Sequence, residues 1–163
     1  MPSSDMNTAD VVPPVSTSFD GGTEADHEQL LFLHHEFLRA NDDLDYERLK
    51  SVWDDNPENR HYNTNGHTYD GLPDWENIWN FYRPQFRLLS PYSPGRVRIV
   101  VRGDMACISA DYVSRHKEWI GRTTEHNPSY YRATQVAIRA ADGWKVIHAH
   151  FSVQDTGTRP DRA

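Results

Sequence analysis

Cysteine is nearly absent from the sequence: Cys107 is its only thiol in 163 residues. One thiol cannot form a disulfide within the chain, which agrees with a reducing compartment. No apolar run approaches the roughly 20 residues that a membrane-spanning helix needs. The N-terminus also lacks the basic segment and apolar stretch of a signal peptide. We therefore expect a cytoplasmic protein without a membrane partner.

Basic clusters and repeats are missing as well. The formal net charge is -7, and no run of lysine and arginine stands out. A nucleic-acid partner is therefore not expected, because binding to phosphates needs concentrated positive charge. With no internal repeat and 163 residues, the chain suits one domain with a substantial core.

Aromatic residues, in contrast, are plentiful, with five Trp, eight Tyr and six Phe. They can fill a core or line a cavity. Residues 1–25 are rich in Ser, Thr, Asp, Pro and Gly, and we expect them to form a flexible tail. Residues 26–155 are predicted to form the folded domain, and residues 156–163 a C-terminal tail.

The first half of the domain reads as helical. Apolar spacing predicts a helix capped by Asp26 and ending near residues 41–42, then a short one over residues 46–53. Asn65-Gly66 predicts a small hairpin. A third helix is predicted to open at residues 71–74, with Pro73 near its first turn and one aromatic stripe of Trp75, Ile78, Trp79, Tyr82 and Phe86. Residues 90–95 read as a loop.

The second half reads as strands. Residues 96–102 and 105–116 flank a turn at Gly103-Asp104, which would pair Ile99 with Ile108 on an apolar face. Residues 130–140 and 143–153 are predicted to form a second hairpin. Helices followed by long antiparallel strands indicate an α+β fold.

The last strand, residues 143–153, carries the most suggestive polar pattern. Regular alternation places His148, His150 and Ser152 on one face, and Phe151 with other apolar residues on the opposite face. The same register sets Gln135 opposite His150. Two imidazoles and a hydroxyl beside small partners predict a polar patch inside a pocket.

Three segments resemble the nuclear transport factor 2-like superfamily, in particular its SnoaL-like and polyketide-cyclase-type members. They are Asn65-Gly66-His67-Thr68-Tyr69-Asp70-Gly71, Arg102-Gly103-Asp104-Met105-Ala106, and the run from Asp142 to Ser152. The resemblance implies a cone: a curved antiparallel β-sheet wrapped around N-terminal helices, with a deep pocket. It also implies a homodimer through the outer sheet face, which would include Val136, Ile138, Ile147 and Phe151.

The closing strand is also similar to two other groups. In the association domain of calcium/calmodulin-dependent protein kinase II, a pocket arginine falls at the position of Gln135. The metal-free iota carbonic anhydrases use a His and a Ser two residues apart, which match His150 and Ser152. Their run of histidines is broken here by Ala149 and Phe151.

These observations predict a set of site residues. His150 would be a general base, since imidazole titrates near neutral pH, with His148 and Tyr112 orienting it or stabilising charge. Gln135 and Ser152 would supply hydrogen bonds to a substrate, together with Tyr62. Trp79 and Tyr82 would wall the pocket. For each residue the alternative is a structural role in the sheet or core.

The expected function is a small-molecule enzyme of the isomerase or lyase type. It would transfer protons on a largely apolar organic substrate, without a cofactor. A non-catalytic binding or oligomerisation module, and an iota-type carbonic anhydrase, are the alternatives. A metal held by the two histidines with His116, His126 or Asp111 is a further option, but no compact ligand motif supports it, and no metal is predicted.

Overall fold

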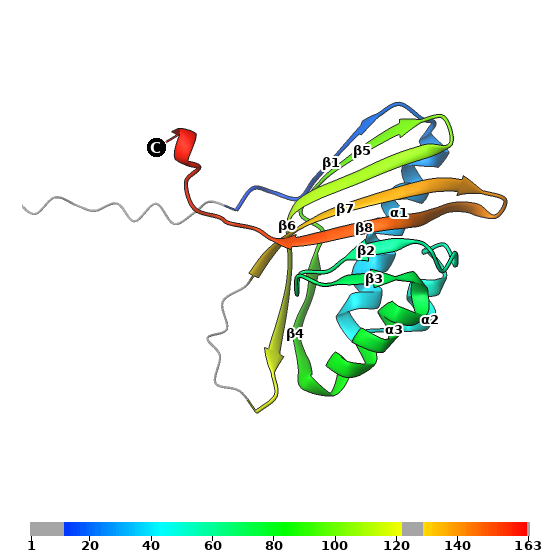
Figure 1. Cartoon of the computed structure of the whole chain (residues 1–163). Coiled ribbons are helices and arrows are strands. Elements are labelled where there is room, and N and C mark those ends of the chain that lie inside the picture. Colours follow the sequence, from blue (N-terminus) through cyan, green and yellow to red (C-terminus); the bar gives the residue numbers. More distant parts are fainter. Residues whose placement is uncertain (1–11, 122–128, 163) are drawn as a thin grey trace, which may run out of the picture.

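The computed structural model describes residues 12–121 and 129–162, and it has the predicted α+β architecture (Figure 1). A curved, unclosed eight-stranded sheet wraps over helix α1 (Glu24–Asp43), with α2 (Tyr46–Lys50) and α3 (Gly71–Tyr82) toward one end. No helix in the described ranges is long and apolar enough to cross a membrane.

The sheet is organised around its longest strand, β6 (Met105–Trp119). On one edge β6 pairs with β5 (Arg96–Arg102) along its first half and with β4 (Phe86–Ser93) along its second. On the other edge lies β7 (Ser129–Ala140), followed by β8 (Gly143–Val153). The short hairpin of β2 (Arg60–Tyr62) and β3 (Thr68–Asp70) continues the sheet beyond β8.

The N-terminal segment departs from the prediction. Residues 16–20, expected in a flexible tail, form strand β1 (Ser16–Asp20), parallel to β5. The N-cap of α1 is Thr23 rather than Asp26. The Thr23 hydroxyl accepts from the Asp26 N–H at 3.2 Å and the Asp26 carboxylate accepts from the Thr23 N–H at 3.0 Å, a reciprocal capping box.

The Asp26 carboxylate also ties the helix to the sheet. It accepts from Arg139 Nη1 at 2.7 Å and from Trp144 Nε1 at 3.0 Å. These hydrogen bonds, led by the one from Arg139, lower the pKa of Asp26 far below its ordinary value. Asp26 therefore anchors α1 to β7 and β8.

The region around α3 follows the prediction in part. The helix ends at Tyr82, and a 3-10 turn (Arg83–Gln85) that contains Pro84 follows it. The predicted hairpin exists, but its connection spans residues 63–67 rather than two residues. The expected loop over residues 90–95 is largely wrong, because strand β4 runs to Ser93 along β6.

The β5–β6 hairpin has the predicted register, with Ile99 opposite Ile108 and Val97 opposite Ala110. The alternation breaks at Tyr112, which adopts a left-handed φ of 53°, and the pairing with β7 shifts between Ala110 and Val113. From Val113 onward, odd-numbered residues of β6 face the helices.

A second bulge changes β8. Val136 pairs with His148 and Ala137 with Val146, so Ile147 is an extra residue in the strand. Trp144 and Val146 are buried before it, and Ala149 and Phe151 are buried after it. The faces predicted for residues 148–153 are thus wrong, because one added residue exchanges the two faces of a strand.

Candidate functional site

A cavity of about 550 Å³ lies between the sheet and the helices, a volume typical of small-molecule sites. Its lining comes from α1, α3, the 63–65 loop, and strands β4, β6, β7 and β8. It is the cavity that a cone-shaped sheet is expected to enclose.

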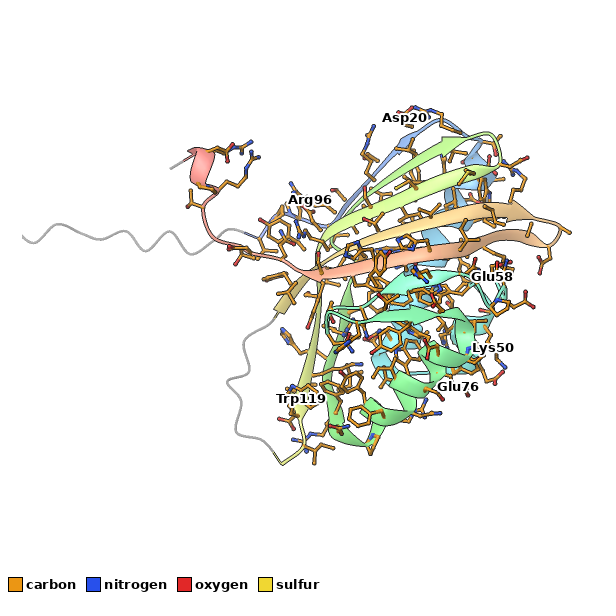
Figure 2. All side chains as sticks on the ribbon, viewed as in Figure 1. Asp20, Lys50, Glu58, Glu76, Arg96 and Trp119 are labelled. Carbon is orange, nitrogen blue, oxygen red and sulfur yellow. The ribbon has the colours of Figure 1, made fainter. Side chains whose placement is uncertain are left out.

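Aromatic rings from several elements form a large part of the cavity wall. Phe37 stacks on Phe151 with ring centroids 4.7 Å apart, and Phe151 contacts Trp75 at 6.0 Å. At the far end of β6, the rings of Phe86 and Trp119 lie 4.0 Å apart. Figure 2 labels Trp119 at this end of the strand, across from α3. Such walls suit a planar, apolar ligand body.

Two cations interrupt this apolar wall, and both come from β6. The Tyr112 bulge points Val113, Arg115, Lys117 and Trp119 into the cavity. Lys117 Nζ donates a hydrogen bond to the carbonyl oxygen of Asn41 on α1, and lies 5.8 Å from the centre of the Phe86 ring. The Arg115 guanidinium lies 5.0 Å from the centre of the Tyr131 ring.

Burial changes how these groups titrate. Desolvation, and then the positive charge of Arg115, lower the pKa of the Lys117 amine to about 7, against the opposing charges of Asp42 and Asp43. Burial likewise lowers the pKa of Arg115 and raises the pKa of Asp42. Because arginine stays protonated in proteins, the cavity holds a fixed cation beside an amine that changes charge near neutral pH.

Buried polar atoms without a protein partner also belong to this wall. Within the described residues, Asn41 Oδ1 and Trp75 Nε1 have no hydrogen-bond partner, although Asn41 is only 6% exposed and Trp75 1%. Asn65 Nδ2 donates to the hydroxyl of Tyr69 at 2.7 Å. An unmatched buried donor or acceptor is costly, so a ligand that pairs with it would gain free energy.

Of the predicted site residues, two line the cavity. Trp79 and Tyr82 project from α3 into it, as expected for wall residues. Gln135 is fully buried but is absent from the lining. Its Nε2 lies 3.1 Å from Nδ1 of His34, whose Nε2 lies 3.2 Å from the Pro94 carbonyl oxygen. Gln135 therefore cross-links the core rather than facing the cavity.

The histidine patch lies on the other side of the sheet. His150 is exposed, and the rings of His148 and His150 flank the Tyr62 ring at 5.3 and 5.2 Å. His148 Nδ1 lies 2.5 Å from the Arg60 carbonyl oxygen, and the Ser152 hydroxyl accepts from Arg132 at 3.1 Å. The prediction that these side chains enter the pocket is wrong, because the Ile147 bulge turns them outward.

Tyr112 is likewise outside the cavity. At the bulge its ring lies 5.3 Å from the Arg96 guanidinium, and its N–H donates to Gln154 Oε1 at 2.7 Å. Arg96 pairs with Asp111. Regular alternation would place Tyr112 on the inner face of β6. Val113 takes that place instead, because the bulge moves the alternation by one residue.

The optional metal site has no support in the described part of the chain, where no three His, Cys, Asp or Glu side chains gather. Asp111 forms an ion pair with Arg96. His116 lines the cavity, whereas His148 and His150 lie on the other side of the sheet. His126 lies outside the described residues.

Sequence reasoning did not single out Arg115 and Lys117. The available signal was their spacing: Val113, Arg115, Lys117 and Trp119 alternate along one face. Without the bulge, however, regular alternation continues the buried face of Ile108 and Ala110 through Tyr112 to Ser114 and His116. That pattern sends both cations to solvent, where charged residues are ordinary.

The comparisons with known proteins agree with this fold. A profile of the SnoaL-like domain matches residues 32–156. A nuclear transport factor 2-like superfamily protein from Salmonella enterica superposes with a TM-score of 0.66 at 19% identity, over 85% of this chain and 99% of its own. A ketosteroid isomerase-like protein from Erwinia carotovora superposes with a TM-score of 0.67 at 11% identity, over 82% of this chain and 99% of its own.

A kinase hub is also similar in fold. The hub of calcium/calmodulin-dependent protein kinase II from S. rosetta superposes with a TM-score of 0.60 at 18% identity, over 78% of this chain and 95% of its own. None of the curated protein sequences that were compared matches the chain. At these identities the solved structures establish the fold alone, whereas the domain profile spans most of the chain. The chain therefore belongs to the SnoaL-like domain family, and its fold is the one seen in nuclear transport factor 2-like proteins.

Proposed function

We propose that the protein is a small-molecule enzyme that transfers protons, without a cofactor, on a largely apolar substrate in the cavity. The observation that carries this proposal is the Lys117 amine, which lies in the wall of a cavity rich in aromatic rings and has its pKa lowered to about 7. A general base works best when its pKa is near the working pH. Lys117 takes the role that the sequence assigned to His150.

The neighbours of Lys117 suit this chemistry. Arg115 supplies a fixed positive charge that can stabilise an enolate or another developing anion. Trp79, Tyr82 and Phe151 offer flat apolar surfaces for the substrate body. The carbonyl oxygen of Asn41 holds the amine in place through one N–H, which leaves the lone pair of the neutral amine free to take a proton.

The test uses nitrobenzisoxazole, a small aromatic compound whose ring opens to a coloured phenolate when a base removes its proton. We expect turnover by the wild type to rise with pH through an inflection near 7. Lys117→Met should abolish that turnover while the far-ultraviolet circular dichroism is unchanged. Lys50→Met is the matched control, because Lys50 pairs with Glu47 on the surface of α2. Equal rates for wild type and Lys117→Met would contradict the proposal.

A second candidate function, association of two copies through the outer sheet face, is favoured by apolar residues on that face. Val136 pairs with Cys107 and Ile138 with Met105, and Met105 is 51% exposed. Phe151, expected on this face, lies instead in the cavity. Light scattering should give twice the mass of the chain, and Ile138→Glu should reduce it to one chain. A wild-type monomer at high concentration would contradict this assignment.

The carbonic anhydrase alternative loses its geometric basis. It required His150 and Ser152 to share the pocket, and both lie on the outer face of β8.

A further inference from the structure

We propose that Lys117 is a nucleophile as well as a base, and forms an imine with an aromatic oxo acid whose carboxylate is held by Arg115. The inference rests on the proposed function, because both place the reaction in the same cavity. It goes beyond that function by naming the substrate class and a covalent intermediate.

The position of the amine carries the first step. An amine attacks a carbonyl carbon only through its lone pair, which the neutral form has and the ammonium lacks. Lys117 is half-buried in the cavity wall near Arg115, and its burial and the neighbouring positive charge both disfavour the ammonium. Its hydrogen bond to the Asn41 carbonyl uses one N–H of the neutral amine, so the lone pair stays available.

Arg115 carries the second step, the choice of substrate. It lies two residues before Lys117 on the same face of β6, so both heads project into one cavity. A guanidinium binds a carboxylate through two parallel N–H donors. The aromatic rings of Trp75, Trp79 and Phe151 would then cover the apolar body of the same molecule.

The unpaired polar atoms support a ligand with oxygen functions. Trp75 Nε1 is a buried donor and Asn41 Oδ1 a buried acceptor, and neither has a partner among the described residues. A carbonyl or carboxylate oxygen can accept from the indole N–H. The Asn41 oxygen can accept from the N–H of the carbinolamine or of the protonated imine.

The reaction balances without any further reactant. The lysine nitrogen bonds to the carbonyl carbon and a proton moves from nitrogen to oxygen, giving a carbinolamine. Loss of the hydroxyl group and one more proton as water then forms the C=N bond. The imine draws electrons from the adjacent carbon, which eases proton loss there. Water restores the amine and the oxo acid.

The test uses phenylpyruvate, which has a carboxylate, a ketone and an aromatic ring, with cyanoborohydride to reduce any imine. We expect one adduct per chain, heavier than the protein by phenylpyruvate less one oxygen atom. The sequence has three lysines, so peptide mapping can compare Lys117 directly with Lys50 and Lys145. Lys117 should react roughly tenfold or more faster at pH 7, since an ordinary lysine is almost fully protonated there.

Two variants separate the roles of the cations. Lys117→Met should remove the adduct. Arg115→Gln should lower trapping of phenylpyruvate about tenfold relative to trapping of benzaldehyde, which lacks the carboxylate, because one charge-assisted contact is lost. The ratio is the readout, since the loss of Arg115 also raises the pKa of Lys117 and slows both reactions.

The outcomes distinguish this inference from the proposed function. Adducts spread over the lysines according to their exposure, in folded wild-type protein, would overturn the inference. If nitrobenzisoxazole turnover still depended on Lys117, proton transfer would stand and only the covalent step would fail. A Lys117 adduct without that turnover would support the inference and remove the proposed base. An unchanged phenylpyruvate-to-benzaldehyde ratio in Arg115→Gln would overturn the carboxylate assignment.

Discussion

Gly95 lies directly against the backbone of Asp111: a Cβ atom built on Gly95 would be 2.0 Å from the Asp111 carbonyl oxygen. The contact is at the bulge of β6, where Tyr112 has its left-handed φ of 53°. Beyond this point Arg115 and Lys117 face the cavity. The close approach of Gly95 is thus a structural condition for the site.

Gly95→Ala should therefore be strongly destabilising. Gly95 is buried with a φ of 71°, and a methyl group has no space beside the Asp111 carbonyl. We expect a loss of about 3 kcal/mol or more in the free energy of unfolding, measured with urea. Gly66→Ala is the control, because Gly66 has a φ of 82° but no neighbour within 4 Å. That variant should lose about 1 kcal/mol from backbone strain alone. Equal losses would show that the contact is unimportant.

The register of β8 gives a second prediction. Phe151 is 8% exposed and stacks on Phe37, so Phe151→Ala should cost about 3 kcal/mol in the free energy of unfolding. His150 is exposed, and His150→Ala should change that free energy by less than about 0.5 kcal/mol. Chemical denaturation of both variants measures this difference. The reverse order would restore the register that regular alternation predicts.

Residue patterns were sufficient for much of the fold. The β5–β6 register follows from the Gly103-Asp104 turn and an apolar residue at every second position. The α3 stripe places Trp79 and Tyr82 in the cavity for the same kind of reason, a period that the helix keeps throughout.

The rest of the site depends on two interruptions of that periodicity. A bulge adds one residue, and its position depends on contacts between distant segments, such as Gly95 with Asp111. The added Ile147 in β8 turned His148 and His150 outward. Histidine and serine are acceptable on either face of a sheet, so the local sequence could not distinguish the observed register from the regular one.

Two buried histidines predict how stability depends on acid. Burial lowers the pKa of His34 to about 4, and burial followed by the charge of His148 lowers the pKa of His61 to about 4. The unfolded chain has an ordinary histidine pKa of about 6.5, so it binds more protons than the folded state between pH 6.5 and 4. Stability contributed by the neutral rings is complete above pH 6.5 and decreases as the pH falls through this window.

We expect each histidine to cost about 2 kcal/mol of unfolding free energy at pH 5 relative to pH 7.5. Urea unfolding of the wild type at both pH values measures the sum. In His34→Asn the dependence on pH should be weaker, even if the variant is less stable overall, because Gln135 loses its partner. The exposed His67 is the control, and His67→Asn should keep the full dependence. An unchanged dependence in His34→Asn would mean that His34 titrates normally.

The Lys117 amine makes the stability of the fold depend on pH at the alkaline end of the range. Its pKa is about 7 in the folded state and about 10.4 when unfolded, so the unfolded chain binds more protons between these values. This group therefore makes the protein less stable as the pH falls from about 10.4 to 7. Lys117→Met should remove that dependence and raise the free energy of unfolding at pH 7 by about 2 kcal/mol, allowing for the lost bond to Asn41.

Denaturant unfolding at pH 7 and pH 9.5 measures this effect, and the surface variant Lys50→Met should differ from wild type by less than about 0.5 kcal/mol at both. A stabilising substitution at a cavity residue has a specific meaning. If removing the amine strengthens the fold and also removes reactivity, the lysine is present for its chemistry, since packing alone would favour methionine. If Lys117→Met weakens the fold at both pH values, Lys117 is instead a structural link between β6 and α1.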